Sequence, residues 1–548
     1  MKIPEKYKKH NPVPLIVVLL VAIFGSTYII YSHAETCSGS SNGQCTGSTA
    51  FNTTSNLYVY PDSSGAMDLM WRPALNPSSN TTYQIFRNNA LLTTVPSSTN
   101  TYTDNTVTAG QQYSYTVSQI TGNNAATAAD TSSVVTATSD TVEAGGSNVV
   151  TVPSSFRGQA IPDDCSADVS VPLTAFIQSV PSNSDVQFAA SGCYDVEGSI
   201  FVAGKTDITI DGNNSQFKTT TSCTAAQPCA AGSPEQNDQS AFININAYHL
   251  YVSGWPRGRS QWNIINGSNI VMKNIHITGP DSSVVYDPNI EGQHGFQVNG
   301  TKNLLIEDTV VRYTYGNAVY IGDAYESPSQ FPDYVTVTNN NFNEIGRQSI
   351  AMVDGQNVTI SNNNIWNPAR SIIDVEPDGN SANIQNLLFI NNVVGGARLS
   401  FFANDGANGA TFNNVVIGGN TVHGMVMSII ANPLGNVSLH PPARQNYIIV
   451  DNDEPDYTAG DPYGLMVFNG VDGLTIKGNY QKIDGNEPGP VVYVNHSKNI
   501  IIRHNIFPGA YSESTGYPHV LGGADFNTVN ECNNLIVLSS LKVDSDCQ

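Results

Sequence analysis

Short stretches in which apolar and polar residues alternate recur along the C-terminal two thirds of the chain, each bordered by asparagine. In the stretch 356–365 (QNVTISNNNI), Val358 and Ile360 alternate with polar residues between an opening and a closing Asn. Similar stretches begin at residues 268, 302, 334, 385, 413, 473 and 498. Alternation with a period of two predicts strands, and a regular repeat of short strands predicts a solenoid.

One coil of such a solenoid cannot bury its apolar residues alone. Stacked coils pair backbone to backbone at about 4.8 Å, and their inward Val, Ile and Leu side chains form one continuous core. Asn at a repeated corner can hydrogen-bond its counterparts in neighbouring coils and tolerates a left-handed backbone. We therefore predict an all-β protein in which residues 152–548 form a parallel β-helix with terminal caps. A leucine-rich horseshoe is the alternative, but helical periodicity is missing between the strands.

The segment before the solenoid predicts a small β-sandwich at residues 54–138, because several short alternating strands follow one another closely. A Ser/Gly/Thr-rich tether at 35–53 precedes it, and a linker at 139–151 follows it. The segment resembles a fibronectin type III domain, with Trp71 as the early core tryptophan and Tyr113 as the corner tyrosine. Within the solenoid, a short helix at 173–180 is expected to cover the first coil.

Residues 1–34 carry the features of an export segment. Four lysines precede an apolar run at 15–31, and Ser32-His33-Ala34 follows it. This order fits a secretory signal, and the run is also long enough for a single transmembrane anchor. Both interpretations place the rest of the chain outside the cytoplasm, either secreted or at the cell surface, with a membrane contact only if the segment is retained.

Charge and cysteine content narrow the functional classes. The net charge of −22 argues against a nucleic-acid-binding protein, which needs a basic surface. All eight cysteines follow the export segment, and an even number in an exported chain favours disulfides. Proximity suggests the pairs Cys37–Cys45, Cys165–Cys193, Cys223–Cys229 and Cys532–Cys547.

A second strand precedes each Asn-bounded stretch, and its outward positions are candidates for chemistry. If Phe296, Val319 and Ile350 point inward, then Gln297, Tyr320 and Asp374 point outward and form one column. Arg347 and Arg370 each precede such a strand and should be neighbours, and Arg398 extends the row. Guanidinium groups one coil apart repel unless an anion lies between them. Asp354, Asp374, Glu376 or an acidic sugar could supply that anion.

The motif Asp374-Val375-Glu376-Pro377-Asp378 is the most charged short segment in a chain with only 12% charged residues. Asp374 and Glu376 could act as acid and base in glycoside hydrolysis, or one of them could orient an Arg that abstracts a proton beside a uronate. With Asp378 they could also bind Ca²⁺, the one cofactor the sequence suggests. The structural alternative is a salt-bridge network that braces the coils.

Several motifs together resemble the pectate-lyase-like superfamily of right-handed β-helices. They are Tyr286-Asp287-Pro288, Gln293-His294-Gly295-Phe296, Gly316-Asn317-Ala318-Val319-Tyr320, Gly346-Arg347-Gln348-Ser349-Ile350 and Ile373-Asp374-Val375-Glu376-Pro377. The resemblance implies a polysaccharide groove along one sheet but no single reaction, since the Asp-Pro-His-Asp signature of the epimerases and the polygalacturonase motifs are absent.

On this basis we expect a lyase, epimerase or hydrolase acting on an acidic polysaccharide. Its catalytic cluster would consist of Arg347, Arg370, Asp374 and Glu376. The substrate would also contact His294, Gln297, Tyr320, Gln348 and Arg398, although His294 has a structural role as its alternative. The competing hypothesis is a non-catalytic adhesin or surface stalk that binds glycans.

Overall fold

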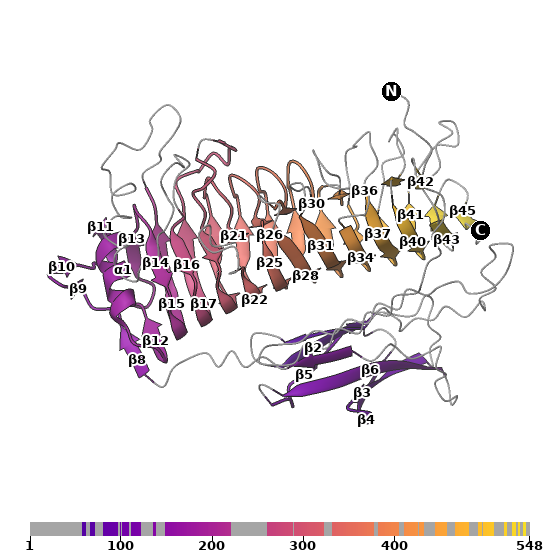
Figure 1. Ribbon diagram of the computed structural model, residues 1–548, viewed down its shortest axis with the longest axis horizontal. Helices are drawn as coiled ribbons and strands as arrows, with labels where there is room; N and C mark the ends of the chain where they lie inside the picture. Colours follow the sequence, from indigo (N-terminus) through magenta and orange to yellow (C-terminus); the bar gives the residue numbers. More distant parts are fainter. Residues whose placement is uncertain are drawn as a thin grey trace, which may run out of the picture.

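The computed structural model contains an N-terminal β-sandwich and a long stack of parallel β-coils (Figure 1). The predicted export segment, the predicted tether and all cysteines except Cys165, Cys193 and the backbone of Cys532 lie outside the described residues. Within the described part of the chain, no helix is long and apolar enough to cross a membrane. The structure describes residues 57–61, 66–71, 81–96, 99, 101–108, 111–121, 135–138, 148–220, 260–288, 290–322, 331–377, 382–404, 410–425, 427–431, 444–456, 466–481, 491–495, 497–508, 520–522, 529–532, 535–537 and 541–543.

Two antiparallel sheets form the sandwich, and their facing side chains share one core. The hydroxyl of Tyr113 accepts a hydrogen bond from the backbone N–H of Thr108 at 2.9 Å, as expected for a corner tyrosine. The side chain of Trp71 lies outside the described residues, and the fibronectin type III assignment stays a prediction. One sheet contains β1 (Leu57–Pro61), β2 (Met67–Trp71) and β5 (Thr101–Asp104), and the other contains β4 (Ala90–Pro96), β3 (Thr81–Arg87), β6 (Gln112–Thr121) and β7 (Val135–Thr138).

A typical coil of the solenoid contributes three strands in succession: a long strand, a short strand and a strand of a separate eleven-stranded sheet. The long strands are β12 (Ser184–Gln187), β15 (Thr206–Lys218), β17 (Ser268–Thr278), β19 (Lys302–Glu307), β22 (Asp333–Thr338), β25 (Gly355–Ser361), β28 (Asn383–Ile390), β31 (Thr411–Gly418), β34 (Arg444–Val450), β37 (Val471–Lys477), β40 (Lys498–Arg503) and β43 (Val529–Cys532). The short strands are β13 (Cys193–Asp195), β20 (Val310–Arg312), β23 (Asn341–Asn343), β26 (Asn364–Trp366), β29 (Val393–Gly395), β32 (Thr421–His423), β35 (Asp453–Glu454), β38 (Tyr480–Gln481), β41 (Ile506–Pro508) and β44 (Leu535–Val537). The eleven-stranded sheet contains β14 (Ile200–Ala203), β16 (Trp262–Ile265), β18 (Phe296–Asn299), β21 (Val319–Gly322), β24 (Ile350–Met352), β27 (Ile373–Val375), β30 (Phe402–Asn404), β33 (Ile429–Ala431), β36 (Met466–Asn469), β39 (Val492–Asn495) and β42 (Val520–Gly522).

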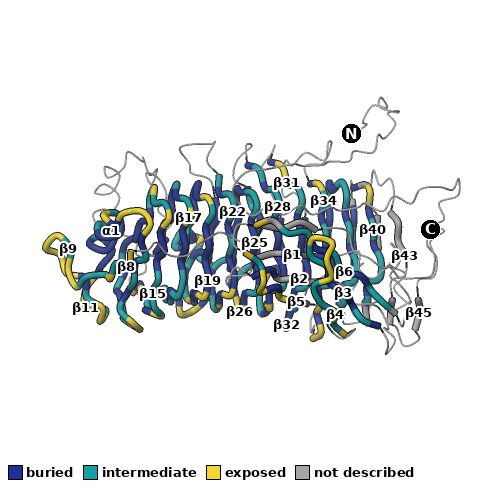
Figure 2. Tube along the Cα trace, turned by 90° about the horizontal axis from the view of Figure 1, so that it is seen from below, coloured by how far each residue is buried: buried dark blue, intermediate teal, exposed yellow. Residues whose placement is uncertain are grey.

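Parallel register between coils puts residues of one kind above one another. Val358 of β25 pairs with Leu387 of β28, and Ile360 pairs with Phe389, so inward apolar side chains stack. Figure 2 shows buried residues along the strands of the solenoid and exposed residues gathered at its edges. Long strands that are not contiguous in sequence therefore share one core, as the alternation of the sequence predicts.

Asparagines at the corner between the long and short strands form an inner Asn ladder. Each Nδ2 donates to Oδ1 of the next ladder residue at 2.8–3.1 Å, and the side chains are buried. The residue before the ladder position adopts a left-handed conformation, as Asn362 and Asn391 do with φ of 56°. The ladder consists of Asn340, Asn363, Asn392, Asn420, Asn452, Asn479 and Asn505.

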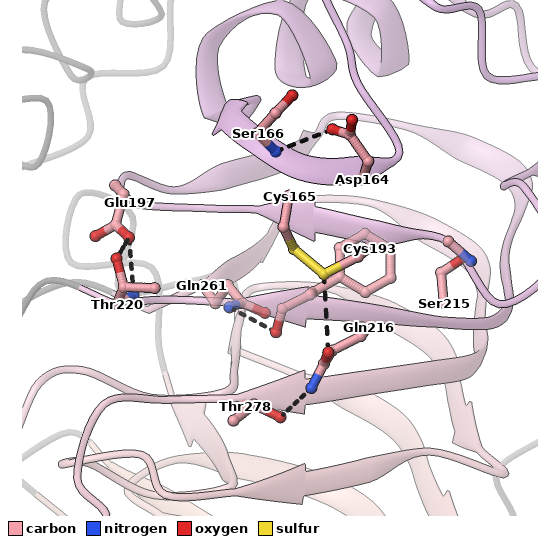
Figure 3. The surroundings of a disulfide bond; sticks show 12 residues. Asp164, Cys165, Ser166, Cys193, Glu197, Ser215, Gln216, Thr220, Gln261 and Thr278 are labelled. Atoms are coloured by element: carbon pink, nitrogen blue, oxygen red, sulfur yellow. Dashed lines mark hydrogen bonds between the residues drawn. A yellow bond between two sulfur atoms is a disulfide. The ribbon is translucent and has the colours of Figure 1, made fainter.

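The N-terminal end of the core is covered by α1 (Ser170–Ser179), which begins three residues before the predicted start. Phe176 and Ile177 of α1 join the core of the coils, and the Nζ of Lys205 donates to two carbonyl groups at the C-terminal end of the helix. The predicted disulfide Cys165–Cys193 joins β11 (Asp164–Asp168) to β13, next to Gln216 of β15 (Figure 3). The remaining end strands are β8 (Asn148–Thr151), β9 (Ser155–Phe156), β10 (Gln159–Ala160), β11 (Asp164–Asp168) and β45 (Leu541–Val543).

Candidate functional site

The predicted arginine row lies on one flank of the solenoid, where each short strand turns into the eleven-stranded sheet. The backbone N–H of Arg370 donates to the carbonyl group of Arg347 at 3.2 Å, and that of Arg398 donates to the carbonyl group of Arg370 at 3.1 Å. The three residues therefore stand in consecutive coils, as the repeat predicts. Their guanidinium groups repel one another unless anions lie close to them. For Arg347, these anions are carboxylates of the protein.

Two carboxylates contact Arg347. Its Nε lies 3.2 Å from Oε2 of Glu291, and its Nη2 lies 3.1 Å from Oε2 of Glu376. Burial alone would lower the pKa of Arg347, but the nearby Glu376, Glu291 and Asp374 carboxylates outweigh it and raise that pKa. Glu291 belongs to the loop between β17 and β18, of which residues 279–288 and 290–295 are described and which we call the covering loop. No periodicity in this segment predicts a role for Glu291. Arg347 thus braces the covering loop against the coil that carries Glu376, as the structural alternative anticipates.

Arg370 has a different environment. Its guanidinium carbon lies 4.6 Å from the ring centroid of Tyr286, a residue of the covering loop. The hydroxyl of Tyr286 donates to Oε2 of Glu291 at 2.6 Å, which fixes the ring under the cation. Among the described residues, Arg370 has no carboxylate within salt-bridge distance, and its buried Nε has no hydrogen-bond partner. Of the two cations, Arg370 is therefore the one whose charge is not matched by a described carboxylate.

The outward column of the eleven-stranded sheet has the predicted register. Gln297 pairs with Tyr320, Tyr320 with Ala351, and Ala351 with Asp374. Asp374 is only 4% exposed, and its Oδ2 accepts a hydrogen bond from Nε2 of Gln348 at 2.5 Å. The carboxylate is therefore held under neighbouring side chains rather than standing open on the sheet, in contrast to our expectation.

His294 is buried and stacks on Tyr320, with ring centroids 4.8 Å apart and planes 11° apart. Its Nδ1 accepts a hydrogen bond from the backbone N–H of Asn317 at 2.9 Å, so the neutral ring carries its proton on Nε2. Burial, followed by the charge of Arg347, lowers the pKa of His294 well below its ordinary value. The stacking and the hydrogen bond hold the ring of His294 in place, and its lowered pKa makes it a poor proton acceptor.

Several buried polar atoms beside this cluster have no hydrogen-bond partner among the described residues. Both amide atoms of Asn317 and Oε1 of Gln348 belong to fully buried side chains, and Oγ of Ser349 and Oε1 of Gln293 are close by in sequence. Buried polar atoms are normally paired, because leaving one unpaired costs about 1–3 kcal/mol. These atoms belong to the same flank of the solenoid as Arg347, but they are buried beneath its surface.

The described residues contain no group of three or more His, Cys, Asp or Glu placed to hold a metal ion. Of the proposed Ca²⁺ ligands, Glu376 pairs with Arg347, Asp374 accepts from Gln348, and Asp378 lies outside the described residues. Asp354, the other candidate anion, instead accepts the backbone N–H groups of Gly355 and Asn383. It therefore shapes a turn between coils.

Comparison with known proteins bears on the fold. Residues 263–432 match the family model described as the right handed beta helix region. The fold is a right-handed parallel β-helix. A search of curated proteins returns no match to this chain.

Solved structures with a similar course of the chain include enzymes and an adhesin. The family 28 exopolygalacturonase of Yersinia enterocolitica has 13% identity and a TM-score of 0.49, over 87% of this chain and 98% of that chain. PfbA, a surface adhesin of Streptococcus pneumoniae, has 13% identity and a TM-score of 0.44, over 70% and 98%. The catalytic unit of a GH87 alpha-1,3-glucanase from Streptomyces thermodiastaticus has 14% identity and a TM-score of 0.33, over 92% and 97%. At this level of likeness, the function has to be argued from the residues of this chain.

Proposed function

We propose that this protein is exported and acts on an acidic polysaccharide at the flank that carries Arg370. The observation that carries the proposal is the charge of Arg370, which lies over the ring of Tyr286 and is not matched by a described carboxylate. A guanidinium group pairs with a uronate carboxylate through two parallel hydrogen bonds. The net charge of −22 repels a polyanion, so binding depends on this local cation.

In this proposal the carboxylates perform any proton transfer. Asp374 lies in the outward column, and Glu376 follows the same strand, so both are candidates for acid and base in a lyase, epimerase or hydrolase reaction. Arg347 holds these groups in place rather than binding the substrate, because Glu291 and Glu376 already contact it. The export segment and the sandwich would place this site outside the cytoplasm, secreted or anchored at the cell surface.

A non-catalytic glycan-binding adhesin or stalk is the second candidate. It is favoured by the burial of Asp374, which is 4% exposed and held by Gln348. Such a carboxylate has little access to a polymer. Under this alternative the same Arg370 contact anchors the glycan, but no bond is broken.

Incubation of the full chain with polygalacturonate, alginate and hyaluronate separates these candidates. A lyase produces unsaturated uronates that absorb in the ultraviolet, a hydrolase produces only new reducing ends, an epimerase changes the sugar stereochemistry, and a binder retards the polymer without product. Asp374→Asn should abolish turnover and retain binding. Arg370→Ala should weaken binding roughly tenfold to a hundredfold, the value of a charge-assisted contact.

Arg312→Ala is the matched control, since it removes the same charge from the exposed outward side of β20, where Arg312 lies over Tyr313. Equal affinity of the wild type and Arg370→Ala for the polymer that binds would refute the proposed site.

A further inference from the structure

A second cluster with the chemistry of a binding site lies on the outward side of the short strands. Trp366 of β26, Gly395 of β29 and His423 of β32 occupy one register column in consecutive coils. A Cβ atom at Gly395 would lie 2.5 Å from Cζ3 of Trp366, so only glycine allows the indole to lie across the next coil. The Nε1 of Trp366 donates to Oδ1 of Asn364 at 2.6 Å, which fixes the orientation of the ring.

His423 continues this surface. Its ring is nearly parallel to the indole of Trp366, with centroids 5.9 Å apart and planes 13° apart. The Nδ1 of His423 lies 3.2 Å from Oδ2 of Asp456, and Oδ1 of Asp456 accepts the backbone N–H of Gly424 at 3.1 Å. The side chains of His423 and Asp456 are 33% and 53% exposed. Two oriented rings and a carboxylate thus stand together at the surface of a rigid sheet.

The charge around these residues selects against an anionic ligand. The short strands from β23 to β38 contain the exposed Asp453 and no lysine or arginine, and the exposed Asp456 lies two residues after β35. A uronate or phosphate would meet carboxylates here and no lysine or arginine of these strands. A neutral pyranose ring fits better, because its apolar C–H face packs on an aromatic ring while its hydroxyls donate to carboxylate and amide oxygens.

We propose that Trp366, His423 and Asp456, which we call the Trp366 platform, bind one pyranose ring of a neutral polysaccharide. Trp366 supplies the packing surface, and His423 extends it. Asp456 accepts hydrogen bonds from the hydroxyl groups of the sugar. Asn364 and Asn367 are exposed at its edge and add amide groups for further hydroxyls. The platform is separate from the Arg370 site in residues and in charge preference, so it does not depend on the function proposed above. It would hold the protein on a neutral glycan while the Arg370 site engages an acidic one.

Calorimetric titration of the full chain with cellohexaose, xylohexaose, mannohexaose, maltohexaose and chitohexaose tests the platform, with trigalacturonate as the acidic probe. We expect at least one neutral hexasaccharide to bind with a dissociation constant in the millimolar range or below. Trp366→Ala should weaken that binding at least about tenfold, the value of one well-packed aromatic contact. Asp456→Asn should weaken it severalfold, and Arg370→Ala should leave it unchanged.

The alternative is that Trp366 only packs against the coil that carries Gly395. In that case Trp366→Ala lowers the melting temperature but no hexasaccharide binds. Absence of binding by all five neutral hexasaccharides at about 10 mM would overturn the proposal. Binding that survives both Trp366→Ala and Asp456→Asn would overturn it too. Because Asp456 is exposed, Asp456→Asn keeps the test decisive if Trp366→Ala fails to fold.

Discussion

Substitution of one residue in the inner Asn ladder tests the physical basis of the coil stack. Asn392 is fully buried, and its side chain makes four hydrogen bonds. Its Nδ2 donates to the carbonyl group of Ile360 and to Oδ1 of Asn420, and its Oδ1 accepts from the backbone and side-chain N–H groups of Asn363. Asn392→Ala removes all four bonds without backbone strain, because Asn392 is not among the residues with positive φ.

The size of the effect follows from those bonds. A buried hydrogen bond contributes about 1 kcal/mol net, so the loss of four lowers the free energy of unfolding by about 4 kcal/mol. The backbone N–H of Asn363 also loses its acceptor inside the stack, which adds to the cost. Because each coil contacts only its neighbours, the damage should be concentrated in the coils of β25, β28 and β31.

Asn386→Gly is the matched control. Asn386 makes two partly exposed hydrogen bonds in a second, outer row of asparagines, to Asn357 and from Asn414. Its φ is 54°, and glycine keeps that conformation without strain. We expect a loss of about 1 kcal/mol, against about 4 for Asn392→Ala, from urea unfolding curves, with hydrogen exchange locating the weakened coils. Equal losses in the two variants would refute the claim that the buried ladder holds the coils together.

Three further predictions concern charge and covalent bonds. Glu454 is fully buried, and burial raises its pKa to about 9, so it stays protonated in the folded state while the unfolded chain ionises near pH 4.5. Stability should therefore fall between about pH 5 and 9, by up to about 1.4 kcal/mol per unit, and melting curves at several pH values should show that Glu454→Gln flattens this slope. Cys165→Ala with Cys193→Ala should lower the free energy of unfolding by about 3 kcal/mol in urea, because the bridge spans 28 residues. Arg347→Ala should lower the melting temperature more than Arg370→Ala does, since it removes the guanidinium group that lies 3.2 Å from the buried carboxylate of Glu291.

The repeat made most of the solenoid predictable. Alternating apolar residues such as Val358 and Ile360 can be buried only in one register, and the bordering asparagines mark corners where the backbone turns left-handed. The order of Gln297, Tyr320 and Asp374 in one column followed from that register. Such patterns follow from the two-residue period of a strand, so the register can be predicted without knowing the course of the loops.

The candidate site was less predictable because part of it comes from the covering loop. Glu291 and Tyr286 lie in a segment without periodicity, and only the folded path brings them to Arg347 and Arg370. The burial of Asp374 and its hydrogen bond from Gln348 are likewise not visible in the alternation of the strand. For Trp366, the one signal in the sequence is a glycine at the matching position of the next coil, which becomes informative only when the register is known.

The most direct test of the proposed site is the affinity of trigalacturonate for three forms of the full chain, measured by titration calorimetry. The account predicts that the wild type and Arg312→Ala bind with similar affinity, while Arg370→Ala binds at least about tenfold more weakly, because one charge-assisted contact is lost. Similar affinity in all three forms, or an equal loss in Arg312→Ala and Arg370→Ala, would contradict it.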